Sequence, residues 1–268
     1  MKNRKAGFTL VEILVTILII AVLSSLGMVG FRRAREKSKA VVELNSAKNL
    51  IAGYLIHAAD NSGKLLVGYD DTLPATNLEG EDLHRPLNAR YPYRLAPSVP
   101  QIRGSIFCNE NESLLNGANA EYNASLRPNL GLNANFVGGF YRGSTLLDPT
   151  SSRITQVYGK FFVSHLAEVN DPAKLIVFAS ARDEQKELGF YQIRPPQMVG
   201  RVWTPKKFTK DAAPTAHGYV DFRWDGKAVV AMLGGNVEML DDEQMRDMRR
   251  WSNQASVDNN PDFLVGRR

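Results

Sequence analysis

The chain has 268 residues, a length that suits one good-sized domain or a small domain with an added element. Its 33 basic and 28 acidic side chains give a formal net charge of +5. Three of the basic residues, Lys2, Arg4 and Lys5, lie at the very start, so the rest of the chain carries 30 basic against 28 acidic side chains. Because a nucleic-acid-binding surface needs clustered Lys and Arg, this near balance argues against one. The single cysteine, Cys108, excludes an internal disulfide.

The basic N-terminal stretch ends at Gly7 and continues into a long apolar block. Between Phe8 and Phe31 the only charged residue is Glu12, and Leu, Ile and Val dominate. As a helix, these 24 residues would be about 36 Å long, enough to cross a bilayer core of about 30 Å. Arginines follow at once, at positions 32, 33 and 35. The pattern predicts a membrane-spanning helix over residues 8–31.

Three kinds of N-terminal segment share such a pattern. A secretory signal peptide normally has an apolar region of about 7–15 residues, shorter than this block, although Ser24 and Ser25 would suit a cleavage site. A simple single-pass anchor explains the length but leaves Glu12 without a use, and a carboxylate within an apolar span is costly. The residues that precede Glu12 indicate the third kind.

Residues 5–12 read Lys-Ala-Gly-Phe-Thr-Leu-Val-Glu and resemble the processing motif of type IV prepilins, the precursors of pilins and pseudopilins. The resemblance implies that a membrane prepilin peptidase cleaves between Gly7 and Phe8 and methylates the new N-terminal Phe8. Glycine suits this position because it lets the backbone approach a protease closely. Glu12 becomes the fifth mature residue. In this family that glutamate is thought to pair with the N-terminal ammonium of a neighbouring subunit, and such a pair is stronger in hydrocarbon than in water.

The helical pattern continues beyond the apolar block. No proline occurs between residues 32 and 60, and Gly53 is the only glycine there. A stripe recurs every three or four residues and comprises Ala34, Ser38, Val41, Leu44, Ala47, Ile51 and Leu55. The charged residues Lys37, Lys39, Glu43 and Lys48 occupy other positions. The sequence Asn-Ser-Gly at 61–63 supplies a stop. We therefore expect one helix of about 50 residues, some 75–80 Å long, ending near Ala59.

The remainder divides by composition into three parts. Residues 61–135 are rich in Gly, Pro, Asn and Asp and predict loops, with a short helix near Gly80–Leu87. Residues 136–251 predict a β-rich head with strands at Phe136–Tyr141, Gln156–Ser164, Leu175–Ala181, Phe190–Arg194, Tyr219–Trp224, Ala228–Leu233 and Val237–Leu240. The last two strands flank a hairpin turn at 234–236. A short helix follows over Asp241–Trp251, and residues 252–268 form a polar tail that we expect to be loose.

Resemblance to pilins implies an α+β fold, with a long N-terminal helix packed on a C-terminal antiparallel β-sheet head. Residues 1–7 are then the leader, 8–31 the transmembrane half of the helix and 32–60 its amphipathic half. The later region resembles the pilin-like proteins of planctomycetes and verrucomicrobia that carry an "H-X9-DG" segment. The resemblance rests on Asn129–Asn133, Pro172–Ala179, His217, Asp225-Gly226 and the final hairpin. It departs from the pattern because only seven residues separate His217 from Asp225, and the closing turn is Gly-Gly-Asn.

The sequence contains no recognisable enzymatic site, and we expect no enzymatic activity and no organic cofactor. The four histidines, His57, His84, His165 and His217, are far apart in the chain, and His217 reads as a turn or surface residue. No zinc-binding pattern, Walker A sequence or G-x-S-x-G motif occurs. Calcium is the one ligand to consider, because some secretion pseudopilins, which this chain resembles, hold it near the C-terminus. The oxygen ligands would be Asp221, Asp225, Asp241 and Asp242, although no EF-hand spacing is present.

Three functions fit this sequence. The first is a type II secretion pseudopilin, and the second is a type IV pilus subunit for adhesion, motility or DNA uptake. The third is a membrane-tethered binding head, for example for glycan, that does not polymerise. The implied partners are prepilin peptidase, copies of the chain, other pilin-like subunits and the filament assembly platform. We expect a single-pass protein of the bacterial cytoplasmic membrane, with its N-terminus held in the cytoplasm by the basic leader and its head periplasmic or extracellular. Lack of paired cysteines favours the pseudopilin over a long extracellular pilus.

Overall fold

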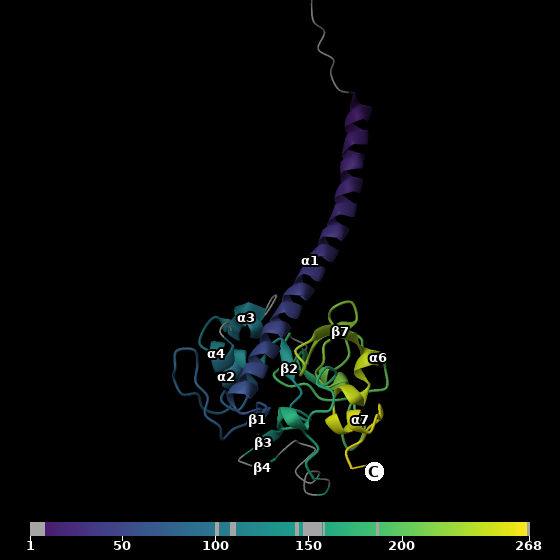
Figure 1. Cartoon of the computed structure of the whole chain (residues 1–268). Helices are drawn as coiled ribbons and strands as arrows, with labels where there is room; N and C mark the ends of the chain where they lie inside the picture. Colours follow the sequence, from purple (N-terminus) through teal and green to yellow (C-terminus); the bar gives the residue numbers. More distant parts are fainter. Residues whose placement is uncertain are drawn as a thin grey trace, which may run out of the picture. The chain divides into compact units, whose positions relative to one another are not determined.

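The computed structural model describes residues 9–99, 102–107, 111–142, 145–146, 157, 159–185 and 188–266. The chain forms two compact units, Met1–Ala40 and Val41–Arg268. Helix α1 (Leu10–Asp60) runs through the first unit and into the second (Figure 1).

Helix α1 is 51 residues long, which confirms the predicted long helix. Its first backbone hydrogen bond runs from the Ile13 N–H to the Thr9 carbonyl at 3.2 Å. Its end is closed by the Gly63 N–H, which donates to the Ala58 carbonyl at 2.7 Å. Gly63 has a φ of 85°, in the left-handed region that favours glycine, so the predicted stop at 61–63 is confirmed.

The second unit contains two sheets. The larger has the strand order β2-β5-β6-β7 and all its pairings are antiparallel. Its strands are β2 (Leu130–Leu132), β5 (Ile176–Ser180), β6 (Lys227–Met232) and β7 (Val237–Asp241). The smaller sheet comprises β1 (Tyr69–Asp70), β3 (Phe140–Arg142) and β4 (Thr145–Leu146), with β1 parallel to β3. A long helix with an antiparallel sheet makes the fold α+β and pilin-like, as predicted.

The remaining helices of this unit are short. The α-helices are α2 (Tyr91–Leu95), α3 (Ile102–Ile106), α4 (Ala120–Leu126), α6 (Asp242–Met245) and α7 (Asn253–Val257). The 3-10 helices are η1 (Ala96–Ser98), η2 (Asn111–Leu115), η3 (Leu166–Glu168), η4 (Pro214–His217) and η5 (Met248–Arg250).

The larger sheet is buried on both faces, because residues alternate between two apolar clusters along β6. Val229 and Ala231 join a cluster that contains Leu50 and Tyr54 of α1. The Tyr54 ring meets Phe178 of β5 edge to face, with ring centroids 5.7 Å apart. On the opposite face, a second cluster includes Ala228, Val230, Met232, Trp203, Met245, Met248 and Trp251. The C-terminal part of α1 therefore packs on the sheet, as predicted.

Several predicted strands are wrong. Among the described residues of 156–164, 190–194 and 219–224, only isolated bridges occur, at Val163, Gln192, Val220 and Trp224. These segments are aromatic and β-prone in composition, but where the structure describes them they pair through single bridges, for example Gln192 with Leu132 of β2, and do not form continuous ladders. The predicted helix at 80–87 is also absent from the structure, which has turns there. Conversely, β2 lies within the part of the chain that was predicted to be loop.

The C-terminal segment is ordered, which corrects the predicted loose tail. Ser252 caps α7 by accepting a hydrogen bond from the Ala255 N–H. Phe263 and Val265 are buried in the second apolar cluster. The Val265 N–H donates to the Met198 carbonyl at 2.8 Å. Only a few apolar residues anchor this segment, and their spacing follows neither helical nor strand periodicity, so the sequence pattern did not reveal it.

Candidate functional site

The apolar segment of α1 exposes its side chains on every side of the helix. From Leu10 to Phe31, every side chain that the structure describes is exposed, for example 79% at Leu10 and 72% at Phe31. In the part of the chain that the structure describes, α1 is the one helix that is long and apolar enough to cross a membrane. An apolar surface of this size needs lipid or other apolar helices around it.

Thr9 and Glu12 form a reciprocal capping box at the start of α1. Glu12 Oε2 accepts hydrogen bonds from the Thr9 N–H and from its hydroxyl, each at 2.8 Å. The Glu12 N–H in turn points to the Thr9 hydroxyl oxygen at 3.3 Å. These bonds satisfy amide groups that the first turn of a helix leaves without partners. The T-x-x-E spacing was visible in the sequence, and the capping role of Glu12 was missed there.

The capping box leaves part of the Glu12 carboxylate available. Only Oε2 takes part, and Oε1 has no hydrogen-bond partner among the residues that the structure describes. The sequence-predicted cleavage and methylation residues, Gly7 and Phe8, lie outside the described residues, as does Cys108. The geometry therefore leaves Oε1 of Glu12 open while Oε2 caps its own helix.

Glu43 lies in the interior of the second unit, although the sequence placed it on the charged side of the helix. Its side chain is fully buried. Arg223 Nε donates to Glu43 Oε2, and Arg223 Nη2 donates to Oε1, each at 3.1 Å. Ser180 of β5 also donates to this carboxylate. Arg223 Nη1 donates to Asp221 at 3.0 Å. This network joins α1 to β5 and to the segment before β6.

The buried face of α1 contains Ala47 and Ile51 of the predicted stripe but extends beyond it to one side. Leu50, Tyr54 and Ala58 are fully buried, whereas Val41 is 54% exposed. Glu43 lies seven residues before Leu50, so both fall on the same face. This spacing was the signal in the sequence that could have identified Glu43 as a buried charge.

The four candidate calcium ligands have different surroundings. Asp221 binds Arg223, and Asp241 caps α6 by accepting from the Gln244 N–H at 2.9 Å. Asp242 forms an ion pair with Arg246 at 3.0 Å. Asp225 lies in the turn before β6, with a φ of 53°. In the described ranges, no group of three or more His, Cys, Asp or Glu is placed to hold a metal ion. The absence of a bound metal stays a prediction, with these four aspartates as the calcium candidates.

His217 is buried, not on the surface as the sequence suggested. It ends η4, and its ring lies among Trp203, Phe208 and Phe222. Its Nε2 is 3.2 Å from the Lys206 carbonyl oxygen. Burial lowers the pKa of His217 below its usual value, although the nearby Asp242 opposes this shift. The residue is therefore part of the aromatic core on one face of the sheet.

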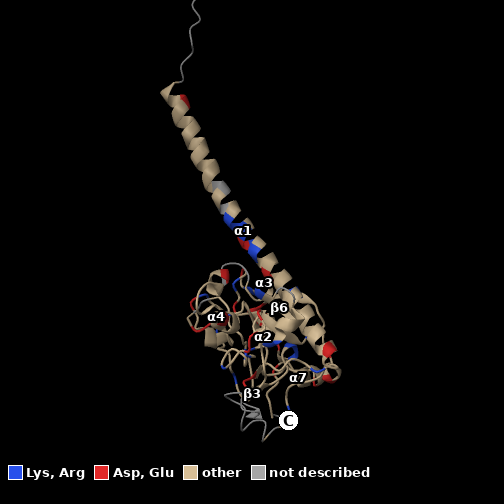
Figure 2. Cartoon of the chain, turned by 90° about the vertical axis from the view of Figure 1, so that its left-hand side faces the viewer, with Lys and Arg blue, Asp and Glu red and all other residues tan. Residues whose placement is uncertain are grey.

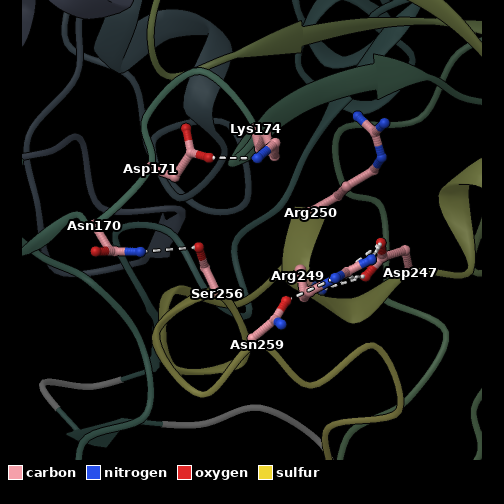
Figure 3. A pocket seen from close by; sticks show the side chains of 8 residues that line it. All are labelled: Asn170, Asp171, Lys174, Asp247, Arg249, Arg250, Ser256 and Asn259. Atoms are coloured by element: carbon pink, nitrogen blue, oxygen red, sulfur yellow. Dashed lines mark hydrogen bonds and ion pairs between the residues drawn. The ribbon is translucent and has the colours of Figure 1, made fainter.

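The second unit contains a polar pocket of about 360 Å³ (Figure 3). It is lined by Asn170, Asp171, Lys174, Asp247, Arg249, Arg250, Ser256 and Asn259. Most of these side chains bind one another, as Figure 3 shows: Lys174 to Asp171 at 2.9 Å, Arg249 to Asp247 at 2.7 Å and Asn170 to Ser256 at 3.2 Å. The two carboxylates pair with Lys174 and Arg249, and the third cation, Arg250, pairs with Glu238 at 3.4 Å, which leaves little charge to attract a ligand.

The comparisons with known proteins bear on the N-terminus. Residues 2–28 match the family model described as the prokaryotic N-terminal methylation motif. A search of curated proteins and a search of solved structures each found no match. The matched range includes Gly7, Phe8 and the Thr9–Glu12 capping box and ends within the apolar segment of α1. The chain therefore carries a prepilin-type N-terminus, which is consistent with a type IV pilin-like or pseudopilin protein.

Proposed function

We propose that this chain is a structural subunit, a pseudopilin, of a type II secretion or type IV pilus-like filament. One observation carries the proposal: a methylation motif leads into a helix whose apolar surface is exposed on every side. In the membrane, lipid covers this surface. In a filament, the apolar stems of neighbouring subunits cover it. A subunit can therefore pass from the membrane to the filament with little change in the apolar area exposed to water.

Processing follows from the same motif. Prepilin peptidase cleaves after Gly7 and methylates the new N-terminal Phe8. Cleavage leaves Thr9 as the second residue, directly behind the new ammonium group. The capping box then fixes the start of α1 and holds Glu12 at a defined place on its first turn. Glu12 Oε1 accepts a hydrogen bond from the N-terminal ammonium of a neighbouring subunit, and this ion pair fixes how far one stem is shifted along the next.

Three variants separate the two uses of Glu12. Glu12→Gln keeps the hydrogen-bond acceptor of the capping box but removes the charge. Thr9→Val removes the capping hydroxyl and keeps the charge. Glu12→Ala removes the capping carboxylate and its charge together. We expect Glu12→Gln and Glu12→Ala to be cleaved and inserted normally but to form no filaments, whereas Thr9→Val still assembles. Electron microscopy of cells that overexpress each variant reads assembly, and mass spectrometry of the purified chain reads cleavage.

Normal filament yield from Glu12→Gln would show that capping, not charge, is the essential role of Glu12. Loss of filaments with Thr9→Val alone would lead to the same conclusion. If the unaltered chain forms no filaments, and cells that carry Glu12→Gln behave like cells that carry the unaltered chain, the chain is a tethered binding head that does not polymerise. A pilus subunit for adhesion, motility or DNA uptake is the remaining alternative, and a neighbouring retraction ATPase gene would favour it over a secretion pseudopilin.

A further inference from the structure

A basic segment of α1 follows the apolar segment without a break, as the blue stretch after the tan stretch in Figure 2 shows. The uncharged run Ile13–Phe31 has 19 residues and therefore a helical length of about 29 Å, which matches a hydrocarbon core of about 30 Å. Arg32 then falls at the boundary between the hydrocarbon and the lipid headgroups. Residues 32–39 contain five basic side chains and one acidic side chain, Glu36.

Four of these cations are exposed and available. Arg32, Arg33, Arg35 and Lys37 are all exposed, and none forms an ion pair with any residue that the structure describes. Glu36 lies one turn from Arg32 and Arg33 but makes no ion pair with either in the described structure. Cations without an ion-pair partner among the described residues are free to bind an anion from outside.

The four cations spread over about 200° of the helix circumference, and the remaining arc of about 160° carries Ala34 and Ser38. With about 100° of rotation per residue, Arg32 and Arg35 lie about 60° apart on one side. Arg33 and Lys37 lie about 40° apart on nearly the opposite side. Along the axis, the four residues cover about 7.5 Å, which is the thickness of the headgroup region of one leaflet. A protein partner would contact one side of the helix, whereas headgroups surround a helix on all sides.

We propose that Arg32, Arg33, Arg35 and Lys37 form a basic collar that binds the phosphate groups of anionic phospholipids in the leaflet on the head side of the span. Arginine suits this role because its guanidinium binds phosphate through two parallel hydrogen bonds. The aliphatic stems of all four side chains can lie along the hydrocarbon while their charges reach the headgroups. The proposal rests on membrane insertion of α1 and not on filament assembly. It implies that extraction of the subunit must break these lipid contacts.

The test uses the full chain in nanodiscs that contain equal amounts of phosphatidylglycerol and phosphatidylcholine. Native mass spectrometry measures which lipids the chain retains when the disc is dissolved. The collar variant replaces all four residues with Gln (Arg32→Gln, Arg33→Gln, Arg35→Gln and Lys37→Gln). A matched control removes four exposed charges from the second unit (Arg201→Gln, Lys206→Gln, Lys207→Gln and Lys210→Gln). Glu36→Gln raises the charge of the collar by one.

We expect the unaltered chain and the control to retain several-fold more phosphatidylglycerol than phosphatidylcholine, and the collar variant to retain both equally. Each charge changes the preference by up to about five-fold, so Glu36→Gln should strengthen it. Equal retention by the unaltered chain, or an unchanged preference in the collar variant, overturns the proposal. If the collar variant keeps its lipid preference but loses filaments, the four cations bind neighbouring subunits instead. Because the discs hold single subunits, a negative result leaves the proposed filament function untouched.

Discussion

Glu43 and Arg223 show how a single buried charge connects the helix to the sheet. Glu43 is fully buried, and only 10% of the Arg223 side chain is exposed. Their double hydrogen bond orients the planar carboxylate and guanidinium groups. Ser180 donates a further hydrogen bond to Glu43, and Asp221 accepts one from Arg223. A buried pair of this kind adds little net stability compared with apolar residues, but it is costly to break on one side only.

We therefore predict that Glu43→Ala lowers the free energy of unfolding by about 3–5 kcal/mol, because it removes the buried carboxylate that accepts from Arg223 Nε and Nη2 and leaves Asp221 as the one carboxylate beside that charge. The double variant Glu43→Leu with Arg223→Leu should be less destabilised than Glu43→Ala. Glu36→Ala, an exposed glutamate of the same helix, is the control and should leave stability unchanged. Chemical denaturation of the detergent-solubilised chain measures all three. A Glu43→Ala variant as stable as the control would contradict this account.

For single residues, the sequence was most informative where spacing defines a motif, and least informative where burial determines the role of the side chain. The prepilin-type motif was readable because each of its positions has a fixed chemical role. The T-x-x-E capping box and the register of Glu43 with Leu50 were also present in the sequence. The capping box went unread because Glu12 was assigned to pairing with another subunit, and the register of Glu43 went unread because a charged residue on a helix is expected to face water. The pairing of Glu43 with Arg223 was not readable, since 180 positions separate the two residues.

Among the elements, strands were predicted well where an apolar run met a defined turn. The predictions at 175–181, 228–233 and 237–240 correspond to β5, β6 and β7, and the hairpin turn at 234–236 is confirmed. Strand β2 was missed because it has three residues with Gly131 at its centre. A Cβ at Gly131 would lie 2.8 Å from the Ile193 side chain, so the glycine is required by close packing and not by a turn. Composition alone does not distinguish these two uses of glycine.

The C-terminal segment provides a prediction at the element scale. Phe263 is buried against the second apolar cluster, far in sequence from most of its neighbours. Phe263→Ala should lower the free energy of unfolding by about 3–5 kcal/mol, because it removes a buried ring and leaves a cavity. Val257→Ala, on the exposed side of α7, is the matched control and should have little effect. The same denaturation measurement applies, and equal stability of the two variants would restore the interpretation of a loose tail.

The four candidate calcium ligands, Asp221, Asp225, Asp241 and Asp242, also belong to the second unit. Three of the four candidate aspartates already bind a guanidinium or a helix N-terminus. We therefore predict that calcium does not raise the melting temperature of the chain relative to a sample with chelator. Differential scanning calorimetry in detergent measures this. An increase of several degrees that Asp225→Asn abolishes would instead establish a calcium site in the turn before β6.

For the whole molecule, the charges at the two ends of the membrane span oppose each other. Three basic residues lie within residues 2–5 and five within residues 32–39. Because basic flanks tend to stay in the cytoplasm, the collar side by itself favours a cytoplasmic head. Export of the head therefore depends more on the leader itself than on which side of the span carries more basic residues. Under the proposed processing, cleavage after Gly7 removes the leader charges, so the orientation must be set before cleavage.

We predict that alkaline phosphatase fused after Arg268 is active, which reports an exported head. Replacing Lys2, Arg4 and Lys5 with Gln should reduce this activity several-fold, because only the basic collar and its neighbours then bias the orientation. Adding the four collar substitutions to that variant should restore much of the activity, since residues 32–39 then carry a single basic side chain, Lys39. A fusion that is inactive in the unaltered chain would place the head in the cytoplasm. Full activity without the leader charges would show that the exported domain, and not its flanks, determines the orientation.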